Sequence, residues 1–199
     1  MRLKITLVLS IFILVFAGCQ SEHKDEADVL IKSGNYREAI ELYTTRLATD
    51  PKNLRMLYNR GRAYEELGKL KEAKADFEKV LEIDENHLSA NMSMGNYFYN
   101  QQNYSRSIYY FDKAISIDGR VSRAYLLKAR ALHQQGDFGS ARENYNFAID
   151  FDKDSEDAHF YRGALYVALN QMRKACDDLT RARELGHPDA AAAISKHCR

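Results

Sequence analysis

Apolar and polar positions along this chain repeat every 34 residues between residues 20 and 189. In each repeat a small residue is followed four positions later by a large apolar or aromatic one, a spacing that places both on one face of a helix. The small column reads Ala39, Ala73, Ser107, Ala141 and Ala175, and the large column reads Tyr43, Phe77, Phe111, Tyr145 and Leu179. The pattern therefore predicts an all-α chain.

A second small column predicts close contact between the two helices of each repeat, and it holds Gly61, Gly95, Ala129 and Gly163. We divide the chain into units one to five, which span residues 20–53, 54–87, 88–121, 122–155 and 156–189. Each unit is expected to be an antiparallel helix pair, with turns near Gly34, Gly68, Gln102, Gly136 and Asn170. Residues 190–199 are expected to form a final capping helix, because the end of a stack of repeats needs a cover.

This pattern resembles the tetratricopeptide repeat, a 34-residue helix-turn-helix unit with fixed large, small and aromatic positions. Three features differ from the family pattern, and one of them is a truncated first helix in unit one. The terminal proline remains only as Pro51, and the tryptophan position holds Leu57, Asn91, Tyr125 and His159. The resemblance implies a tetratricopeptide-repeat (TPR) solenoid of about five repeats, with the array over residues 27–189.

The N-terminal residues have the layout of a signal peptide. Arg2 and Lys4 precede an apolar run of 13 residues, from Ile5 to Ala17. That run is shorter than the ~20 residues that a membrane-spanning helix needs, which argues against the alternative of an uncleaved anchor. We therefore expect residues 1–18 to be removed.

The end of this run resembles the bacterial lipobox, because Ala17 and Gly18 precede Cys19. The resemblance implies cleavage before Cys19, a lipid on its sulfur and a short tether over residues 19–26. By analogy with lipoprotein sorting, Gln20 implies the outer membrane, and we expect the periplasmic face, with the cell surface as the alternative.

Charge and motifs narrow the function classes. The chain carries a net charge of +1, which becomes −1 without residues 1–18, so nucleic acid is not an expected partner. None of the common hydrolase, nucleotide-binding or CxxC motifs occurs, and the six histidines are spread over different units. We expect no enzymatic activity, no cofactor and no metal site.

Two cysteines remain if Cys19 carries a lipid. Cys176 lies in the last unit and Cys198 in the expected capping helix. Outside the cytoplasm such a pair favours a disulfide, which would fasten the cap, and the alternative is a pair of buried free thiols.

A candidate binding surface follows by elimination. In the first helix of each unit, positions 4, 8 and 11 are taken by packing, which leaves positions 2, 5, 9 and 12, and positions 5, 9 and 12 share one face. In the tetratricopeptide-repeat family this stripe lines a concave groove for extended peptides or partner helices. Arginine and tyrosine are frequent at binding hot spots. The candidate groove residues are Arg55, Tyr58, Arg62, Met92, Asn96, Tyr99, Arg123, Arg130, His133 and Phe160.

These residues predict a partner that is an acidic peptide with an apolar anchor, and the alternative is an ordinary solvated face. The expected function is a membrane-anchored protein–protein interaction scaffold or adaptor in the bacterial cell envelope. Two alternatives remain open: a surface-exposed binding lipoprotein, and a hydrolase with an unrecognised site in the groove.

Overall fold

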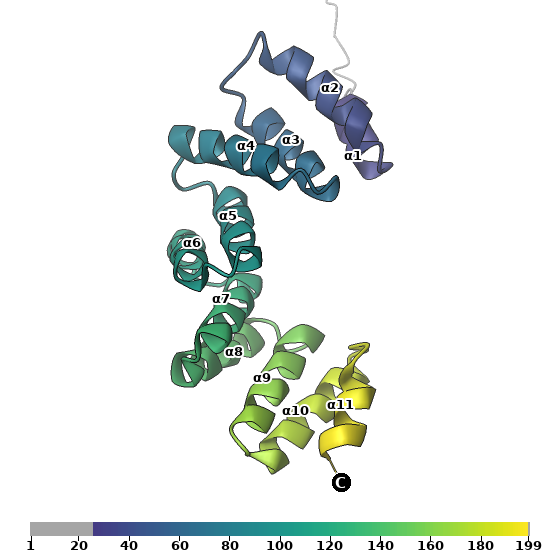
Figure 1. Cartoon of the computed structure of the whole chain (residues 1–199), viewed down its shortest axis with the longest axis vertical. Helices are drawn as coiled ribbons and strands as arrows, with labels where there is room; N and C mark the ends of the chain where they lie inside the picture. The colour runs from purple at the N-terminus through teal and green to yellow at the C-terminus, as the bar shows by residue number, and fades with distance from the viewer. Residues whose placement is uncertain (1–25, 199) are drawn as a thin grey trace, which may run out of the picture.

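Residues 26–198 are described by a computed structural model, in which they form eleven helices and no strand (Figure 1). This confirms the predicted all-α solenoid. The helices are α1 (Glu26–Lys32), α2 (Tyr36–Leu47), α3 (Leu54–Glu66), α4 (Leu70–Ile83), α5 (Leu88–Asn100), α6 (Tyr104–Ile117), α7 (Ser122–Gln135), α8 (Phe138–Phe151), α9 (Glu156–Ala168), α10 (Met172–Glu184) and α11 (Ala190–His197).

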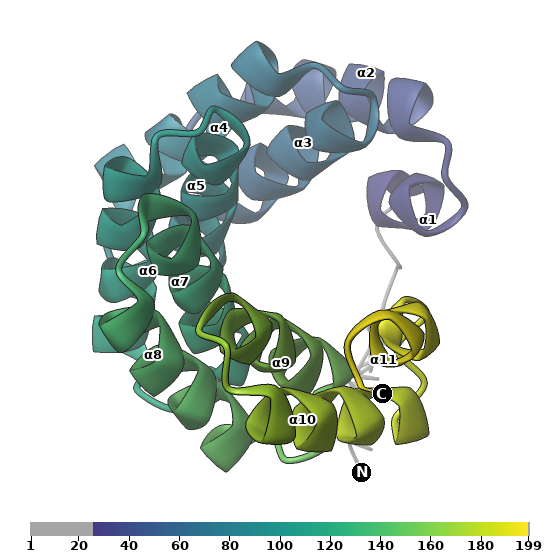
Figure 2. The same cartoon turned by 60° about the horizontal axis from the view of Figure 1, so that its bottom comes forward.

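The helices stack in chain order into a curved array, with α1 and α2 at one end of the long axis and α11 at the other (Figure 1). Figure 2 shows that α3, α5, α7 and α9 form the inner row of the curve, whereas α4, α6, α8 and α10 form the outer row. Each helix contacts mainly its neighbours in sequence, as a solenoid requires. The inner row is therefore the surface where a groove could lie.

The turns within the helix pairs lie where the sequence predicts them. The backbone φ angle is positive at Gly34, Gly68, Gln102, Gly136 and Asn170. Gln102 and Asn170 adopt φ values of 57°, which only a few non-glycine residues do. Side chains also define where helices begin, since Asn53 accepts a hydrogen bond from the backbone N–H of Met56 at the start of α3.

Packing between the two helices of a unit depends on the small column. A Cβ placed on Gly61 would lie 2.6 Å from a ring carbon of Phe77, and one on Gly95 would lie 2.5 Å from a ring carbon of Phe111. Both rings are fully buried. The small residues are therefore needed because an aromatic ring of the second helix occupies the space of a side chain on the first.

The C-terminal end of the array is closed by α11. Cys176 of α10 and Cys198 form a disulfide with a Cα–Cα distance of 5.6 Å, and Ala190 at the start of α11 is fully buried. The predicted signal peptide and the lipid site at Cys19 lie outside the described residues. No helix within residues 26–198 is long and apolar enough to cross a membrane.

Candidate functional site

The N-terminal part of the predicted stripe is engaged in contacts within the chain. Arg55 forms an ion pair with Asp28 of α1, and the Arg62 guanidinium lies 2.7 Å from Glu65 and 3.4 Å from Glu66 on its own helix. Burial raises the pKa of Glu65, and the Arg62 charge opposes that shift. Arg62 is exposed, so its ion pairs are solvated and weak.

Tyr58 was predicted to face the groove, but its ring packs against neighbouring side chains. Its ring centroid lies 5.7 Å from that of Phe77 and 5.3 Å from that of His87, and it packs against two of the core clusters. Met92 and Asn96 of α5 are half-buried. The stripe at units two and three therefore offers less free surface than a solvent-facing helix would.

The centre of the stripe contains an arginine held between aromatic rings. The Arg130 guanidinium carbon lies 5.2 Å from the ring centroid of Tyr99 and 4.3 Å from that of Tyr161, within cation–π range. Tyr161 was missed by the sequence analysis because it lies one position beyond Phe160, outside the positions assigned to the stripe. Three inner helices, α5, α7 and α9, thus meet at Arg130.

Beneath this cluster lies a buried polar group. Tyr145 of α8 is 0% exposed, and its hydroxyl has no hydrogen-bond partner among the described residues. Burial raises the pKa of the Tyr145 phenol far above its ordinary value, and the charge of Arg130 opposes the shift. A buried hydroxyl without a partner costs free energy, so it is informative about the site.

A pocket opens beside Arg130 between α7 and α9, with a cavity volume of about 430 Å³. The α7 wall is basic and apolar, with Ser122, Arg123, Leu126, Leu127 and Arg130. The facing wall is acidic, with Asp152, Ser155, Glu156 and Asp157. The prediction of an acidic peptide partner is therefore incomplete, because the fold brings Glu156 and Asp157 of the next unit to the pocket of the two arginines.

The C-terminal end of the stripe is partly covered by the loop that precedes α11. The Phe160 ring stacks on His187, with centroids 3.8 Å apart, and His187 Nε2 lies 3.4 Å from Asp157 Oδ1. His133 lies edge-on to Phe138, and burial lowers the pKa of His133. Of the predicted residues, Arg123 and Arg130 therefore line the pocket, and Tyr99 contacts Arg130 from α5. Phe160 and His133 pack against other rings of the chain.

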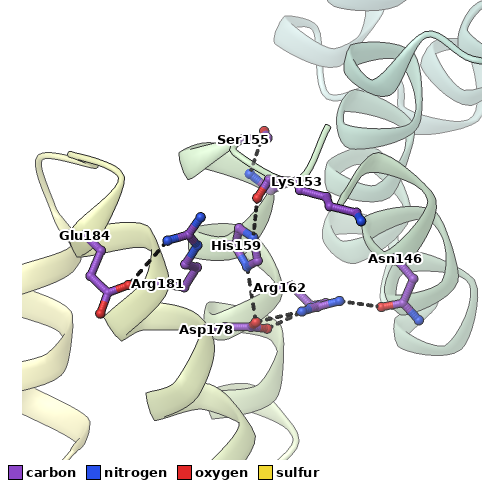
Figure 3. A network of polar contacts seen from close by, with 9 residues as sticks. Asn146, Lys153, Ser155, His159, Arg162, Asp178, Arg181 and Glu184 are labelled. Atoms are coloured by element: carbon purple, nitrogen blue, oxygen red, sulfur yellow. Dashed lines mark hydrogen bonds and ion pairs between the residues drawn. The ribbon is translucent and has the colours of Figure 1, made fainter. Parts of the chain in front are cut away.

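A second polar network joins units four and five, away from the pocket (Figure 3). Asp178 accepts two hydrogen bonds of 2.7 Å from Arg162, whose guanidinium also donates to Asn146 at 2.8 Å. Burial alone would raise the pKa of Asp178, but the hydrogen bonds from Arg162 and His159 hold it below its ordinary value. Because the Asp178 carboxylate and the Arg162 guanidinium are both used in these contacts, the network is structural.

The side chains at the pocket are suited to contacts with charged and apolar groups. Among residues 26–198 no group of three or more histidine, cysteine or acidic side chains is placed to hold a metal ion. The pocket instead offers two guanidinium groups, two leucines, flanking tyrosines and carboxylates on one wall. Such a surface suits an extended chain with charged and apolar side chains.

Comparisons with known proteins agree with the fold. Residues 24–87 match a tetratricopeptide repeat model, and residues 129–170 match a TPR repeat model. The human DnaJ homolog subfamily C member 7 is 27% identical over 138 residues, which are 67% of this chain and 27% of that protein. The chain thus spans about a quarter of the length of this relative.

Solved structures show the same architecture. MamA from Desulfovibrio magneticus RS-1 superposes with a TM-score of 0.74 at 22% identity, over 80% of this chain and 90% of that chain. YrrB, described as a TPR protein with an unusual peptide-binding site, superposes with a TM-score of 0.71 at 21% identity, over 85% of this chain and 88% of that chain. The chain therefore carries tetratricopeptide repeats, and its fold is a TPR solenoid.

Proposed function

We propose that this protein is a non-enzymatic adaptor that binds an extended peptide segment of a partner protein along its inner row of helices. The observation that carries the proposal is the pocket beside Arg130, where α5, α7 and α9 gather arginine, tyrosine and leucine side chains. Grooves of this composition bind peptides through aromatic and arginine anchors. The description of YrrB as having a peptide-binding site supports the same mode of binding for this fold.

The proposed location is the periplasmic face of the outer membrane, through a lipid on Cys19. The support is the lipobox-like Ala17-Gly18-Cys19 and the Gln20 that follows. Helix α1 begins at Glu26, seven residues after Cys19, so an extended tether holds the array within about 25 Å of the lipid surface. The partner is then a membrane-associated protein of the cell envelope.

The test of the groove is crosslinking in intact cells with two charge-reversed variants. Arg130→Glu reverses the charge at the pocket, whereas Arg173→Glu makes the same change at an exposed position of the outer helix α10. We expect specific crosslinked neighbours to be lost only in Arg130→Glu, with the helical circular dichroism unchanged in both. Identical neighbours in the wild type and both variants would show that the groove is not the binding surface.

The lipid anchor is tested separately with Cys19→Ser and metabolic labelling with an alkyne fatty acid. We expect the label and the membrane association in the wild type only, and an unlabelled wild type refutes the anchor. Protease treatment of intact cells then decides the side of the membrane, because digestion without lysis contradicts the periplasmic placement.

A further inference from the structure

Unit one shows how this fold holds a carboxylate on its inner surface. The Tyr43 hydroxyl donates a hydrogen bond of 2.5 Å to Asp28 Oδ1, and Asn59 Nδ2 donates to the same oxygen at 3.0 Å. Arg55 pairs with the other carboxylate oxygen. One carboxylate from α1 thus joins a buried tyrosine of α2 to an arginine and an asparagine of α3.

The same positions recur three periods later with different residues. The large column again holds a tyrosine, Tyr145, but the position of Asp28 is taken by an arginine. The correspondences by the 34-residue period are Asp28 with Arg130, Tyr43 with Tyr145, Arg55 with Asp157, and Asn59 with Tyr161. The tyrosine is therefore the same at both places, whereas the acid and the arginine have exchanged positions.

The contacts of the fourth unit reflect this exchange. The Tyr145 hydroxyl is fully buried and has no hydrogen-bond partner among the described residues. Within residues 26–198 neither Arg123 nor Arg130 forms an ion pair, and Arg130 stacks on Tyr161 instead. Asp157, which could have paired with Arg130, lies against His187.

This arrangement is particular to the fourth unit. The large column holds Phe77, Phe111 and Leu179 in units two, three and five, so no hydroxyl needs a partner there. Among residues 26–198, only Tyr145 is a buried tyrosine whose hydroxyl has no hydrogen-bond partner. The nearby Arg130, whose charge acts on this phenol, forms no ion pair within this part of the chain and lines the 430 Å³ pocket together with Arg123.

We infer that a carboxylate of the bound peptide fills this place, pairing with Arg130 and Arg123 and accepting a hydrogen bond from Tyr145 as Asp28 does from Tyr43. Arg130 turns from the Tyr161 ring toward the carboxylate as it binds. The inference rests on the proposed function and specifies its ligand: an aspartate or glutamate side chain in an extended segment.

The opposite wall of the pocket defines the neighbouring residue. Asp152 and Glu156 face the arginines, so a run of acidic residues in the ligand would be repelled. A lysine or arginine next to the bound acid is attracted to this wall. The expected ligand is therefore a single acid followed or preceded by a base, which narrows the uniformly acidic peptide expected from the sequence.

The test is selection from a random heptapeptide display library on the purified full-length chain in detergent. We expect the wild type to enrich peptides in which an acid adjoins a base. With Arg130→Gln the enrichment of the acid should disappear, and with Tyr145→Phe, which keeps both arginines, it should fall. Tyr43→Phe, the matched change in unit one, should leave it unchanged. A selected peptide is then synthesised with its acid replaced by the corresponding amide.

The amide peptide should bind the wild type about tenfold more weakly than the parent peptide, and this difference should be smaller in Tyr145→Phe, which lacks the hydroxyl donor. Synthetic peptides with a free or an amidated C terminus distinguish a side-chain carboxylate from a terminal one. If tight binding requires the free C terminus, the assignment to a side chain is wrong. Enriched peptides without an acid refute the inference but leave peptide binding intact. Equal enrichment of the same peptides by the wild type and by Arg130→Glu would refute both the carboxylate inference and peptide binding in this groove.

Discussion

The same substitution in two different repeats should lower the stability of the protein in one repeat only. Tyr43→Phe and Tyr145→Phe each remove one hydroxyl from a fully buried ring of the same column. The ring itself should fit, because Phe77 and Phe111 occupy this column in units two and three. The comparison therefore isolates the hydroxyl group and its partners.

The magnitudes follow from the partners. The Tyr43 hydroxyl donates to the Asp28 carboxylate, and a hydrogen bond to a charged group contributes about 1.5–3 kcal/mol. Since Asp28 keeps Arg55 and Asn59, we expect a loss near the lower end, about 1.5 kcal/mol. The Tyr145 hydroxyl has no partner among the described residues, so its removal should leave the free energy of unfolding unchanged or raise it by up to about 1 kcal/mol.

The assay is urea unfolding followed by circular dichroism, with hydrogen exchange to locate each change. For a chain of this size, 1.5 kcal/mol corresponds to a decrease in Tm of about 3–6 °C. A loss of stability in Tyr145→Phe as large as that in Tyr43→Phe would show that the Tyr145 hydroxyl already has a partner in the free protein. The inferred carboxylate site would then lose its physical basis.

Three further substitutions test the packing and the charges of the array. Gly95→Ala places a Cβ 2.5 Å from a ring carbon of Phe111, so it should lower the free energy of unfolding by about 1–3 kcal/mol, measured by urea unfolding. Cys198→Ala opens the disulfide loop, and in the chain-entropy model it should cost about 3 kcal/mol and speed hydrogen exchange in α11. Asp178→Asn leaves the Arg162 guanidinium without its buried carboxylate, so at neutral pH it should cost about 3 kcal/mol. Because the pKa of Asp178 is lowered by folding, its contribution is present above the unfolded pKa of about 4 and is lost as the pH falls through the lower folded value, so the variant and the wild type should converge in acid.

Each of these substitutions has a matched control. Gly139→Ala adds a Cβ whose nearest neighbour is 3.7 Å away, so it should change stability little, and an equal loss in both glycine variants would refute the packing argument. A reductant should destabilise the wild type but not Cys198→Ala, and equal sensitivity would contradict the role of the disulfide. Asp177→Asn changes the exposed neighbour of Asp178, and a pH dependence altered as much as in Asp178→Asn would mean that the buried ion pair is not responsible.

The repeat period fixed most of the architecture in advance. A 34-residue recurrence of small and large residues can bury its apolar faces only by stacking, so the helix pairs and their turns could be assigned from the sequence. Even the non-glycine turn residues Gln102 and Asn170 were located by their position in the 34-residue period rather than by their residue type. The disulfide partners were identified as a pair, but only the packing of α11 on α10 brings them to 5.6 Å.

The candidate site was found in outline only. The stripe rule identified Tyr99, Arg123 and Arg130, but it treated Tyr58 as available although that ring packs on Phe77. It also predicted an acidic peptide as the partner, because it considered the charges of one helix at a time. Contacts between units decide what faces a side chain, and they place carboxylates of unit five opposite the arginines of unit four.

The sequence by itself determined the helices, their order and the face that each presents, because helical periodicity acts over a few residues. The tertiary structure alone decided which side chains from different units meet. The positions of Asp28 and Arg130 are equivalent in the period, yet one completes a hydrogen-bonded network and the other leaves a tyrosine hydroxyl without a partner. That difference depends on four positions that come together from three helices. Because these positions are far apart in the sequence, a local sequence pattern does not reveal it.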